Sequence, residues 1–319
     1  MIAGFASAIE RAESILLTTT ELDGDAVGAI VSLALAIQSQ WPSKAVQCIT
    51  HEELPKRYLC IVPDASLFKL AATTDVKTRD LAIVLDGDPD RLRSATEHYQ
   101  AARRSGIIDH HKSSAGHACD IALHDASAAS TTELILRLCD HWGLPLTQDI
   151  AKAIYAGLVF DTSIFRYGHT APETLRIAAR LIETGFDHRA VVEKVLLEQA
   201  QDKVRLKGAM INRMRVRFNG QYVWSALNAS EVNGAETGGL VDDLVFVEGV
   251  EVGALLVERP DGCIKVSLRS RGGVDVADLA QRCEKTGGGH ARAAGVTLSG
   301  SIDSVAAQID SELGKLLTH

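Results

Sequence analysis

The residues with the clearest chemical potential are acids and histidines that follow short apolar segments. These segments begin at residues 15, 81 and 106 and predict buried strands. Two carboxylates side by side cost free energy unless a cation neutralises them, and a divalent metal is the simplest such cation. We therefore expect one metal site that gathers the side chains behind these strands and the acid that ends a later apolar helix. The set comprises Asp23, Asp25, Asp86, Asp109, His110, His111 and Asp161.

The ligand types narrow the choice of metal. Aspartate and histidine without a thiolate suit Mn²⁺, Mg²⁺ or Fe²⁺ better than a structural zinc ion. Several carboxylates in one pocket favour two ions about 3.5–4 Å apart that share a carboxylate, an arrangement that activates water and clamps a phosphoryl group. Each aspartate taken alone is also explained as a helix cap or a turn residue. Their recurrence behind successive strands favours a site that hydrolyses a phosphate ester or anhydride.

Alternating strands and helices must position these side chains. We expect strands at 15–20, 45–50, 81–85, 106–108 and 121–123, and helices at 26–40, 90–103, 131–142, 149–160 and 171–184. Ser130 is a plausible helix cap, Pro172 suits a first turn, and Gly185 suits a helix stop. The alternation predicts an α/β fold with a doubly wound, mostly parallel sheet. In such a sheet, ligands bind outside the carboxyl ends of the strands.

The second half of the chain has a different pattern of predicted helices and strands. A charged, amphipathic helical stretch at 187–214 is followed by two hairpin patterns, 215–218 with 222–227 and 250–258 with 263–268. The first hairpin is expected to turn at Asn219 and Gly220. A helix at 275–284, a strand at 295–299 and a helix at 303–317 complete a smaller α+β domain. We place the domains at 1–190 and 215–319, joined by a helical connector at 191–214.

Two polar clusters in the second domain suit an anionic substrate. Gly287, Gly288, Gly289 and His290 precede Arg292, and Arg269-Ser270-Arg271 follows a strand. Glycine-rich loops can cradle phosphate through backbone N–H groups, and the arginine fork matches phosphate geometry. A plain tight turn explains the glycines equally simply. With the arginines beside them, we expect this domain to bind substrate in a cleft while the first domain supplies the chemistry.

Composition limits the class of partner. The chain has 319 residues and a net charge of −8, with no block of lysine and arginine that could track many phosphates. This excludes long nucleic acid and leaves short phosphorylated compounds. No apolar run reaches 18 residues, and the N-terminus lacks a signal-peptide pattern, so we expect no membrane association and a cytoplasmic location. The six cysteines are scattered, as reduced core residues are.

These motifs resemble those of the DHH phosphoesterase superfamily. Asp109-His110-His111, together with the other first-domain acids, is similar to its metal-binding signature, and 287–295 resembles its DHH-associated C-terminal domain. The stretches 125–132, 157–167, 170–176 and 266–270 are similar to the nanoRNase/pAp-phosphatase branch. The likeness covers nearly the whole chain, with the motifs in the family order.

The resemblance implies roles for individual residues. Asp23 and Asp86 would bind one Mn²⁺, and Asp25, Asp86, His110 and Asp161 would bind a second, with Mg²⁺ or another divalent ion as a substitute. Asp109 and His111 would be catalytic, with His111 at the scissile phosphate. The substrate's other phosphate or its base would be held by Arg269, Ser270, Gly288, Gly289 and His290. Arg166 would bind substrate or support the Asp161 loop, the role of Arg292 is open, and a homodimer is the family-level expectation.

One position departs from the family pattern. The nanoRNase branch has a metal-binding histidine four residues before the first aspartate, where this chain has Thr19. A hydroxyl is a poor replacement for imidazole on Mn²⁺. Glu21 lies two residues before Asp23, so we hypothesise that Glu21 replaces the missing ligand. The alternative is that Glu21 is a solvated loop residue.

Three functions follow. The first is metal-dependent hydrolysis of very short nucleotides, such as pGpG, pApA, nanoRNA or pAp. The second is an exopolyphosphatase or pyrophosphatase activity, which would need a cleft dense in lysine and arginine. The third is a one-metal, non-catalytic nucleotide-binding protein, suggested by Thr19. An exonuclease of the RecJ type fits less well, because the chain is acidic and too short for an added nucleic-acid-binding domain.

Overall fold

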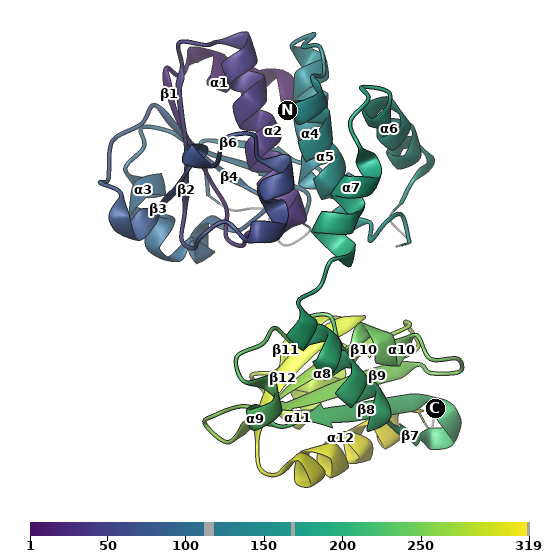
Figure 1. Cartoon of the computed structure of the whole chain (residues 1–319). Helices are drawn as coiled ribbons and strands as arrows, with labels where there is room; N and C mark the ends of the chain where they lie inside the picture. The colour runs from purple at the N-terminus through teal and green to yellow at the C-terminus, as the bar shows by residue number, and fades with distance from the viewer. Residues whose placement is uncertain (112–117, 167–169, 318–319) are drawn as a thin grey trace. The chain divides into compact units, whose positions relative to one another are not determined.

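The computed structural model describes residues 1–111, 118–166 and 170–317. The chain divides into two compact units, Met1–Glu198 and Gln199–His319 (Figure 1). Each unit has its own six-stranded sheet and its own hydrophobic core. No helix among the described residues is long and apolar enough to cross a bilayer.

The sheet of the first unit is parallel throughout, in the order β3-β2-β1-β4-β5-β6. Its strands are β1 (Ser14–Thr18), β2 (Ala45–Thr50), β3 (Phe68–Leu70), β4 (Leu81–Leu85), β5 (Ser105–Asp109) and β6 (Ile121–His124). The predicted parallel α/β sheet is thus confirmed. Because the strands run in the same direction, the segments after β1, β4 and β5 emerge at one edge, where Asp86 and the Asp109 segment lie.

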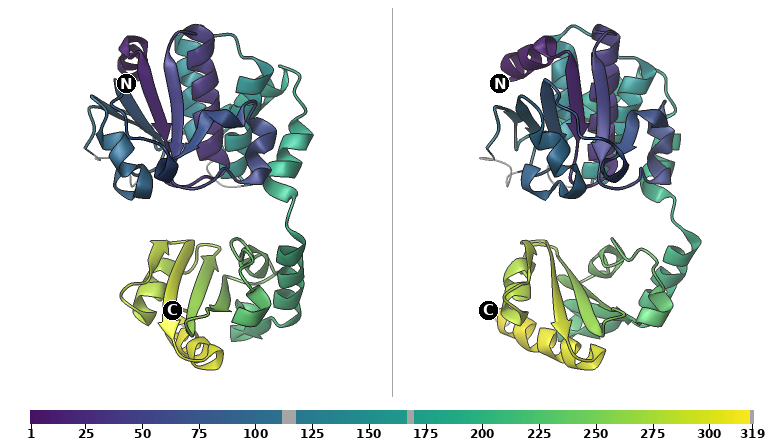
Figure 2. Two further views of the ribbon diagram at one scale, coloured as in Figure 1. Left: turned by 60° about the vertical axis from the view of Figure 1, so that its left-hand side comes forward. Right: turned by 90° about the vertical axis from the view of Figure 1, so that its left-hand side faces the viewer.

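Helices cover one face of this sheet and shorter turns cover the other. The main helices are α1 (Ile2–Arg11), α2 (Gly24–Gln40), α4 (Thr131–His141) and α5 (Gln148–Asp161). Helices α2, α4 and α5 lie side by side and share one core with the strand residues that face them (Figure 2). Helices α6 (Pro172–Ile182) and α7 (His188–Val192) pack against α5. The opposite face packs on α3 (Thr96–Gln100) and on short 3-10 turns.

The helix expected at 90–103 is wrong. The segment forms two 3-10 turns, η4 (Pro89–Arg91) and η5 (Arg93–Ala95), before the single turn of α3. Arg93 has φ of +54°, which a right-handed helix does not allow, so the helical pattern breaks there. Further 3-10 turns are η1 (Lys56–Ile61), η2 (Ala65–Leu67) and η3 (Ala71–Thr73).

The second unit has a mixed sheet in the order β11-β12-β10-β9-β8-β7, in which only β8 and β9 are parallel. Its strands are β7 (Arg215–Arg217), β8 (Tyr222–Leu227), β9 (Val252–Glu258), β10 (Cys263–Ser270), β11 (Gly288–His290) and β12 (Ala293–Ser299). Helices α11 (Val276–Cys283) and α12 (Ile302–Leu317) share one core with the sheet. Helices α8 (Gln201–Asn212) and α10 (Asp242–Val245) share another, and α9 (Ala229–Val232) is a single turn.

Three predictions from the sequence differ from the structure of this unit and of the segment that leads into it. The stretch placed as a connector at 191–214 is not one helix, because α7 continues as the π-turn η7 (Glu193–Leu197) and the chain is extended at Glu198 before α8. The first hairpin turns through η8 (Phe218–Gly220) rather than through two residues. The glycine stretch forms the edge strand β11, not a loop, and Gly289 there has φ of +143°.

Candidate metal centre

Two carboxylates lie at the start of α2. Asp23 is the N-cap, and its Oδ1 accepts the backbone N–H groups of Asp25 and Ala26, both at 3.0 Å. Burial, aided by the charge of Asp25, raises the pKa of Asp23 to about 6 against the lowering effect of the Ala26 N–H. Asp23 therefore holds a proton more tightly than a solvated aspartate, as expected of an acid placed among other acids.

Asp25 is completely buried, and α4 holds its carboxylate. Oδ2 accepts the N–H of Thr131 at 2.5 Å, and Oδ1 accepts the N–H of Thr132 at 3.0 Å. Ser130 caps α4 as predicted, so these donors belong to the first turn of a helix, where negative charge is favoured. A Cβ on Gly157 of α5 would lie 2.3 Å from Asp25 Oδ1, so this position needs glycine.

Asp86 directly follows β4 and has φ of +54°, an unusual conformation for a residue with a side chain. Its Oδ1 accepts the hydroxyl of Thr131 at 2.9 Å. Burial, followed by the charges of Asp25 and Asp23, raises the pKa of Asp86 well above its ordinary value. Thr131 thus contacts both buried acids, Asp25 through its backbone and Asp86 through its side chain.

Asp109 organises the two histidines that follow it. Its buried Oδ1 accepts the backbone N–H of His110 at 2.7 Å, the backbone N–H of His111 at 3.1 Å and the ring Nδ1 of His111 at 2.8 Å. The hydrogen bond to Asp109 raises the pKa of His111. The His111 side chain is 50% exposed whereas His110 is mostly buried, so the two rings face different surroundings.

His110 turns toward the end of α5. Its Nδ1 faces the carbonyl of Ala128 at 3.2 Å, and its Nε2 lies 2.9 Å from Asp161 Oδ2. Burial by itself lowers the pKa of His110, but the contact with Asp161 and the charge of Asp25 outweigh it and raise the pKa to about 9. Burial and the charge of Asp25 raise the pKa of Asp161 to about 7, against the lowering effect of His110.

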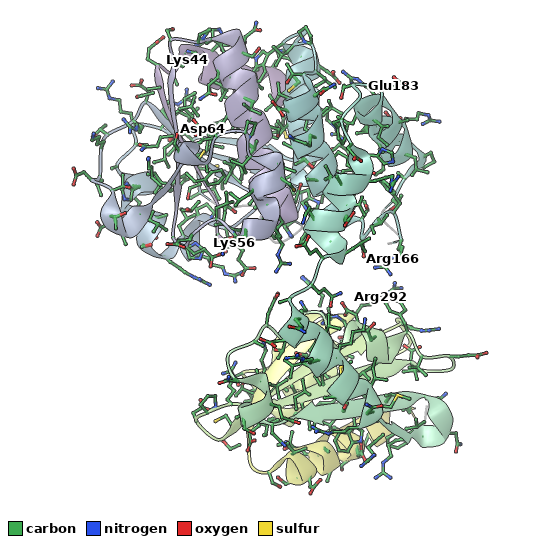
Figure 3. The ribbon with its side chains drawn as sticks, in the orientation of Figure 1. Lys44, Lys56, Asp64, Arg166, Glu183 and Arg292 are labelled. Atoms are coloured by element: carbon green, nitrogen blue, oxygen red, sulfur yellow. The ribbon has the colours of Figure 1, made fainter. Side chains whose placement is uncertain are left out.

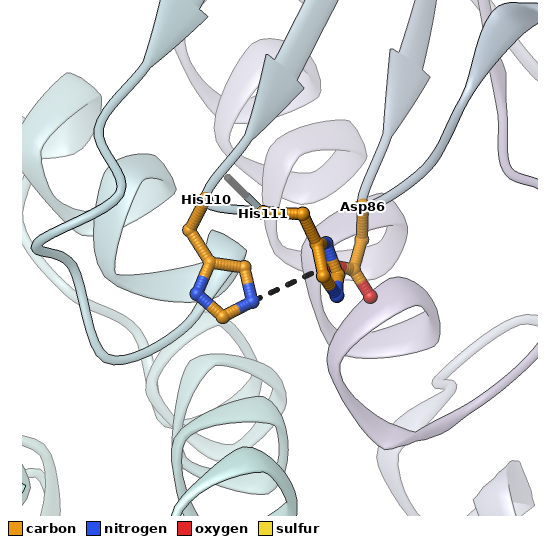
Figure 4. Close-up of side chains that lie close together, drawn as sticks. All are labelled: Asp86, His110 and His111. Atoms are coloured by element: carbon orange, nitrogen blue, oxygen red, sulfur yellow. Dashed lines mark ion pairs between the residues drawn. The ribbon is translucent and has the colours of Figure 1, made fainter. Parts of the chain in front are cut away.

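These side chains form two overlapping groups with the spacing of metal ligands. The ligand atoms within each group lie within 4.8 Å of one another. Figure 4 shows Asp86 and the two histidines converging, with His110 Nε2 3.8 Å from Asp86 Oδ1. The groups are Asp86 with His110 and His111, and Asp25 with His110 and Asp161.

The arrangement fits divalent cations better than protein hydrogen bonds alone. His110 Nε2 and Asp161 Oδ2 are buried, yet neither atom has a hydrogen-bond partner of good geometry among the described residues. Apart from their contact with each other at 2.9 Å, these buried atoms lack the hydrogen bonds that buried polar groups need, and a cation bound by both would supply a partner for each. The donors are carboxylate oxygens and imidazole nitrogens, which suit Mn²⁺ and Mg²⁺.

Thr19 and Glu21, where the sequence departs from the family pattern, lie outside both ligand groups. Thr19 is buried, and its hydroxyl faces the carbonyls of Glu21 at 3.2 Å and Asp86 at 3.5 Å. The Glu21 side chain is exposed, and its carboxylate lies 3.6 Å from Arg91. The described structure therefore brings neither side chain into either metal-binding group.

Arg166 folds back on its own turn. Nε of Arg166, which is labelled in Figure 3, donates to the carbonyl of Ser163 at 2.9 Å, and its Nη2 donates to the hydroxyl of Ser163 at 2.6 Å. Ser163, Ile164 and Phe165 all have positive φ. Arg166 thus ties together the strained turn that directly follows Asp161, which is the supporting role considered from the sequence.

The substrate-binding candidates of the second unit come together around one loop. Ser270 N donates to the carbonyl of Arg292 at 3.0 Å, and a Cβ on Gly272 would lie 3.0 Å from Arg292 Nη2. Arg269 donates from Nε to Asp242 at 2.7 Å. His290, exposed at the end of β11, pairs with Ala293 in the sheet, and Gly288 and Gly289 lie on the same strand.

Sequence reasoning missed the residues that fix the acids rather than the acids themselves. Thr131, Thr132 and Gly157 fall in stretches that resemble the nanoRNase/pAp-phosphatase branch, but none of them was assigned a role from the sequence. A signal was present, because Ser130-Thr131-Thr132 offers a cap and two adjacent hydroxyls in a row. Only the packing of α4 and α5 against α2 reveals that these residues meet Asp25 and Asp86.

Comparison with known proteins identifies two family domains in this chain. Residues 14–158 match the N-terminal domain of the DHH family, and residues 219–315 match the DHHA1 domain. The bifunctional oligoribonuclease and PAP phosphatase NrnA of Thermus thermophilus is 30% identical over 296 residues, which is 89% of this chain and 84% of that protein.

Solved structures show the same fold. An exopolyphosphatase-related protein from Bacteroides fragilis matches with a TM-score of 0.88 and 25% identity, over 98% of this chain and 95% of that one. RecJ from Thermus thermophilus in complex with Mn²⁺ matches with a TM-score of 0.58 and 12% identity, over 98% of this chain and 54% of that one, which shows the fold alone.

The relatives are named as phosphatases and nucleases, and the chain is accordingly a hydrolase of phosphate esters. It carries a DHH N-terminal domain followed by a DHHA1 domain, with the acid and histidine groups at the carboxyl edge of the first sheet. The chain belongs to the DHH phosphoesterase family.

Proposed function

We propose that this protein uses two divalent metal ions to hydrolyse phosphoester bonds in very short nucleotides. The observation that carries the proposal is the pair of overlapping ligand groups that share His110, with buried Nε2 and Oδ2 atoms lacking partners of good geometry. Linear dinucleotides such as pGpG and pApA, nanoRNA and pAp are the proposed substrates. Mn²⁺ is the proposed ion, with Mg²⁺ as a substitute.

The proposed ligands are Asp23, Asp25, Asp86, His110 and Asp161. His110 is common to the two ligand groups and Asp23 lies in neither, while the family resemblance makes Asp86 the ligand shared between the ions. Bound ions of this kind neutralise charge on the phosphoryl group and supply an activated water. The residues of the chain keep the ligands in place, because the α4 N–H groups hold Asp25 and the Thr131 hydroxyl holds Asp86. Glu21 remains a hypothetical further ligand.

His111 is the proposed proton donor to the leaving oxygen. Asp109 accepts its Nδ1 proton, so Nε2 is the nitrogen that we assign to the substrate. The raised pKa keeps the ring protonated at higher pH than a solvated histidine, as a general acid requires. Asp109 acts through His111 and is therefore a positioning residue.

The second unit and the net charge of the chain both support short nucleotides as the substrate class. Arg269 and Arg292 flank one loop, as a site for a second phosphate would require. The net charge of −8 disfavours polymers. The similar protein from Thermus thermophilus is named for oligoribonuclease and PAP phosphatase activities, which supports short nucleotides. A cytoplasmic location and a homodimer remain predictions.

A second candidate is hydrolysis of polyphosphate or pyrophosphate. The similar solved structure from Bacteroides fragilis is that of an exopolyphosphatase-related protein, which favours this function over a non-catalytic one. Mass spectrometry of products from 5′-phosphorylated dinucleotides, pAp and polyphosphate in Mn²⁺ would separate the classes. We expect mononucleotides from dinucleotides. Orthophosphate from polyphosphate, with no nucleotide turnover, would overturn the proposal.

A further inference from the structure

The carboxylate of Glu251 accepts several hydrogen bonds from the loop that follows β10. Its Oε1 accepts the backbone N–H groups of Gly272 at 3.0 Å, Gly273 at 2.6 Å and Val274 at 3.3 Å. It also accepts the hydroxyl of Ser270 at 3.0 Å. One oxygen of Glu251, just ahead of β9, thereby receives four donors from a single loop.

Successive backbone N–H groups that converge on one point form a concave anion-binding site. Such a site commonly receives a ligand, but here an acid of the chain itself occupies it. Hydrogen bonds to an ionised acceptor are roughly twice as strong as neutral ones. Four of them on Glu251 tie the loop 270–274 to the start of β9, in addition to the backbone bond from Arg271 N to the Glu251 carbonyl at 3.0 Å.

This contact determines what Ser270 can do. A serine hydroxyl has one proton to donate, and Ser270 gives it to Glu251 while its oxygen accepts the N–H of Gly272 at 2.9 Å. A phosphate oxygen needs a donor. In this geometry the Ser270 hydroxyl stabilises the loop. The direct phosphate contact that the family resemblance assigns to Ser270 would then come from neighbouring residues.

Those neighbours are two arginines, one just before the loop in the sequence and one packed against it. Arg269 Nε is paired with Asp242 and its Nη1 donates to the carbonyl of Leu268 at 3.1 Å, which leaves Nη2 without a partner among the described residues. Arg292 lies against Gly272, and its carbonyl accepts Ser270 N. The shape of the loop therefore sets the position of Arg292, whereas the guanidinium of Arg269, a residue of β10, is held by Asp242 of α10.

We propose that Glu251 is a positioning residue for substrate: it fixes the loop 270–274 and through it aims Arg292, beside Arg269, at a phosphate of the nucleotide. The inference rests on the proposed function, since it presupposes a phosphorylated nucleotide as substrate. The Glu251 carboxylate would then lie in a phosphate-binding region, where its negative charge would otherwise repel the ligand. The four donors offset that charge, because each aligns its dipole with the carboxylate.

Glu251→Ala, Glu251→Gln and the control Glu248→Ala test the proposal in the full Mn²⁺-loaded protein. Glu248 is an exposed acid three residues earlier in the chain. With a 5′-phosphorylated dinucleotide, we expect Glu251→Ala to raise KM roughly tenfold, a loss of about 1.4 kcal/mol of binding, while kcat stays within about twofold. Glu251→Gln keeps an acceptor oxygen and should recover most of the affinity, and Glu248→Ala should match the wild type.

Two further readouts separate positioning from general stability. Hydrogen exchange at 272–274 should accelerate in Glu251→Ala and recover in Glu251→Gln, because these amides lose and regain their acceptor. Added acetate, a small carboxylate for the emptied position, should lower the raised KM of Glu251→Ala, and chloride should not.

An unchanged KM in Glu251→Ala, with an active wild type, would overturn the inference and leave the proposed function standing. So would a fall in kcat and melting temperature at constant KM, since that pattern reports only a damaged fold. A wild-type protein that turns over no short nucleotide would overturn both, because the positioning role needs that substrate.

Discussion

The carboxylate of Asp25 and the backbone N–H of Thr131 meet at 2.5 Å across 106 positions of sequence. The same threonine donates its hydroxyl to Asp86. One residue at the start of α4 therefore connects an acid in the first turn of α2 with an acid that directly follows β4. The candidate metal centre depends on this helix start as much as on the acids themselves.

Removing the hydroxyl of Thr131 should weaken metal binding without unfolding the protein. Thr131→Val keeps the backbone N–H to Asp25 but leaves Asp86 Oδ1 without its donor. We expect a roughly 10–100-fold loss of Mn²⁺ affinity by calorimetry, as for other residues that orient ligands. Thr131→Ser retains the hydroxyl and should restore most of the affinity. Equal affinity in Thr131→Val and wild type would show that the contact is incidental.

Substitution of Gly157 should be costly in both stability and metal binding. The added methyl group of Gly157→Ala would lie 2.3 Å from Asp25 Oδ1 and 2.5 Å from Thr132 Oγ1. We expect a loss of about 1–3 kcal/mol in the free energy of unfolding. The control is Gly208→Ala in α8, where no atom lies within 4 Å of the new Cβ; it should stabilise by roughly 0.5–1 kcal/mol through helix propensity. Similar effects of the two changes would contradict the packing described around Asp25.

The stability of the metal-free protein should fall as the pH rises. The pKa values of Asp23, Asp161 and His110 are raised to about 6, about 7 and about 9. A group that binds its proton more tightly when folded favours the folded state at low pH, and this advantage is lost as the pH passes its folded pKa. Thermal melting in chelator should therefore show a decline through this range.

Added Mn²⁺ should reverse that decline, since the cation replaces the lost protons. Asp161→Asn removes one of the shifted acids and should flatten the profile. A metal-free protein whose melting temperature rises steadily from pH 6 to pH 9 would contradict the electrostatic account.

Glu21 offers a test of the departure from the family pattern. In this structure its exposed carboxylate faces Arg91 at 3.6 Å. Exposed ion pairs of this kind contribute little, so Glu21→Gln should leave Mn²⁺ stoichiometry and affinity unchanged in a calorimetric titration. A clear loss of affinity or of one ion would instead support Glu21 as the replacement for the ligand absent at Thr19.

The acids at the sheet edge were predictable because they follow continuous apolar runs, and parallel strands bring their carboxyl ends to one edge. Leu81–Leu85 followed by Asp86 is the clearest case. The break at Arg93 was not, since a positive φ in a residue other than glycine leaves no mark in composition. The roles of Thr131 and Glu251 depend on contacts between distant segments, to which local patterns are blind.

The most direct test of the central claim is the rate of hydrolysis of a 5′-phosphorylated diadenylate by wild type and Asp86→Asn, each measured without metal and after addition of Mn²⁺. We predict no turnover by the metal-free wild type, mononucleotide release after Mn²⁺ is added, and a loss of activity of roughly 10²-fold or more in Asp86→Asn, because the proposed shared ligand is removed. Turnover by the metal-free protein, or an Asp86→Asn variant as active as wild type, would contradict the account.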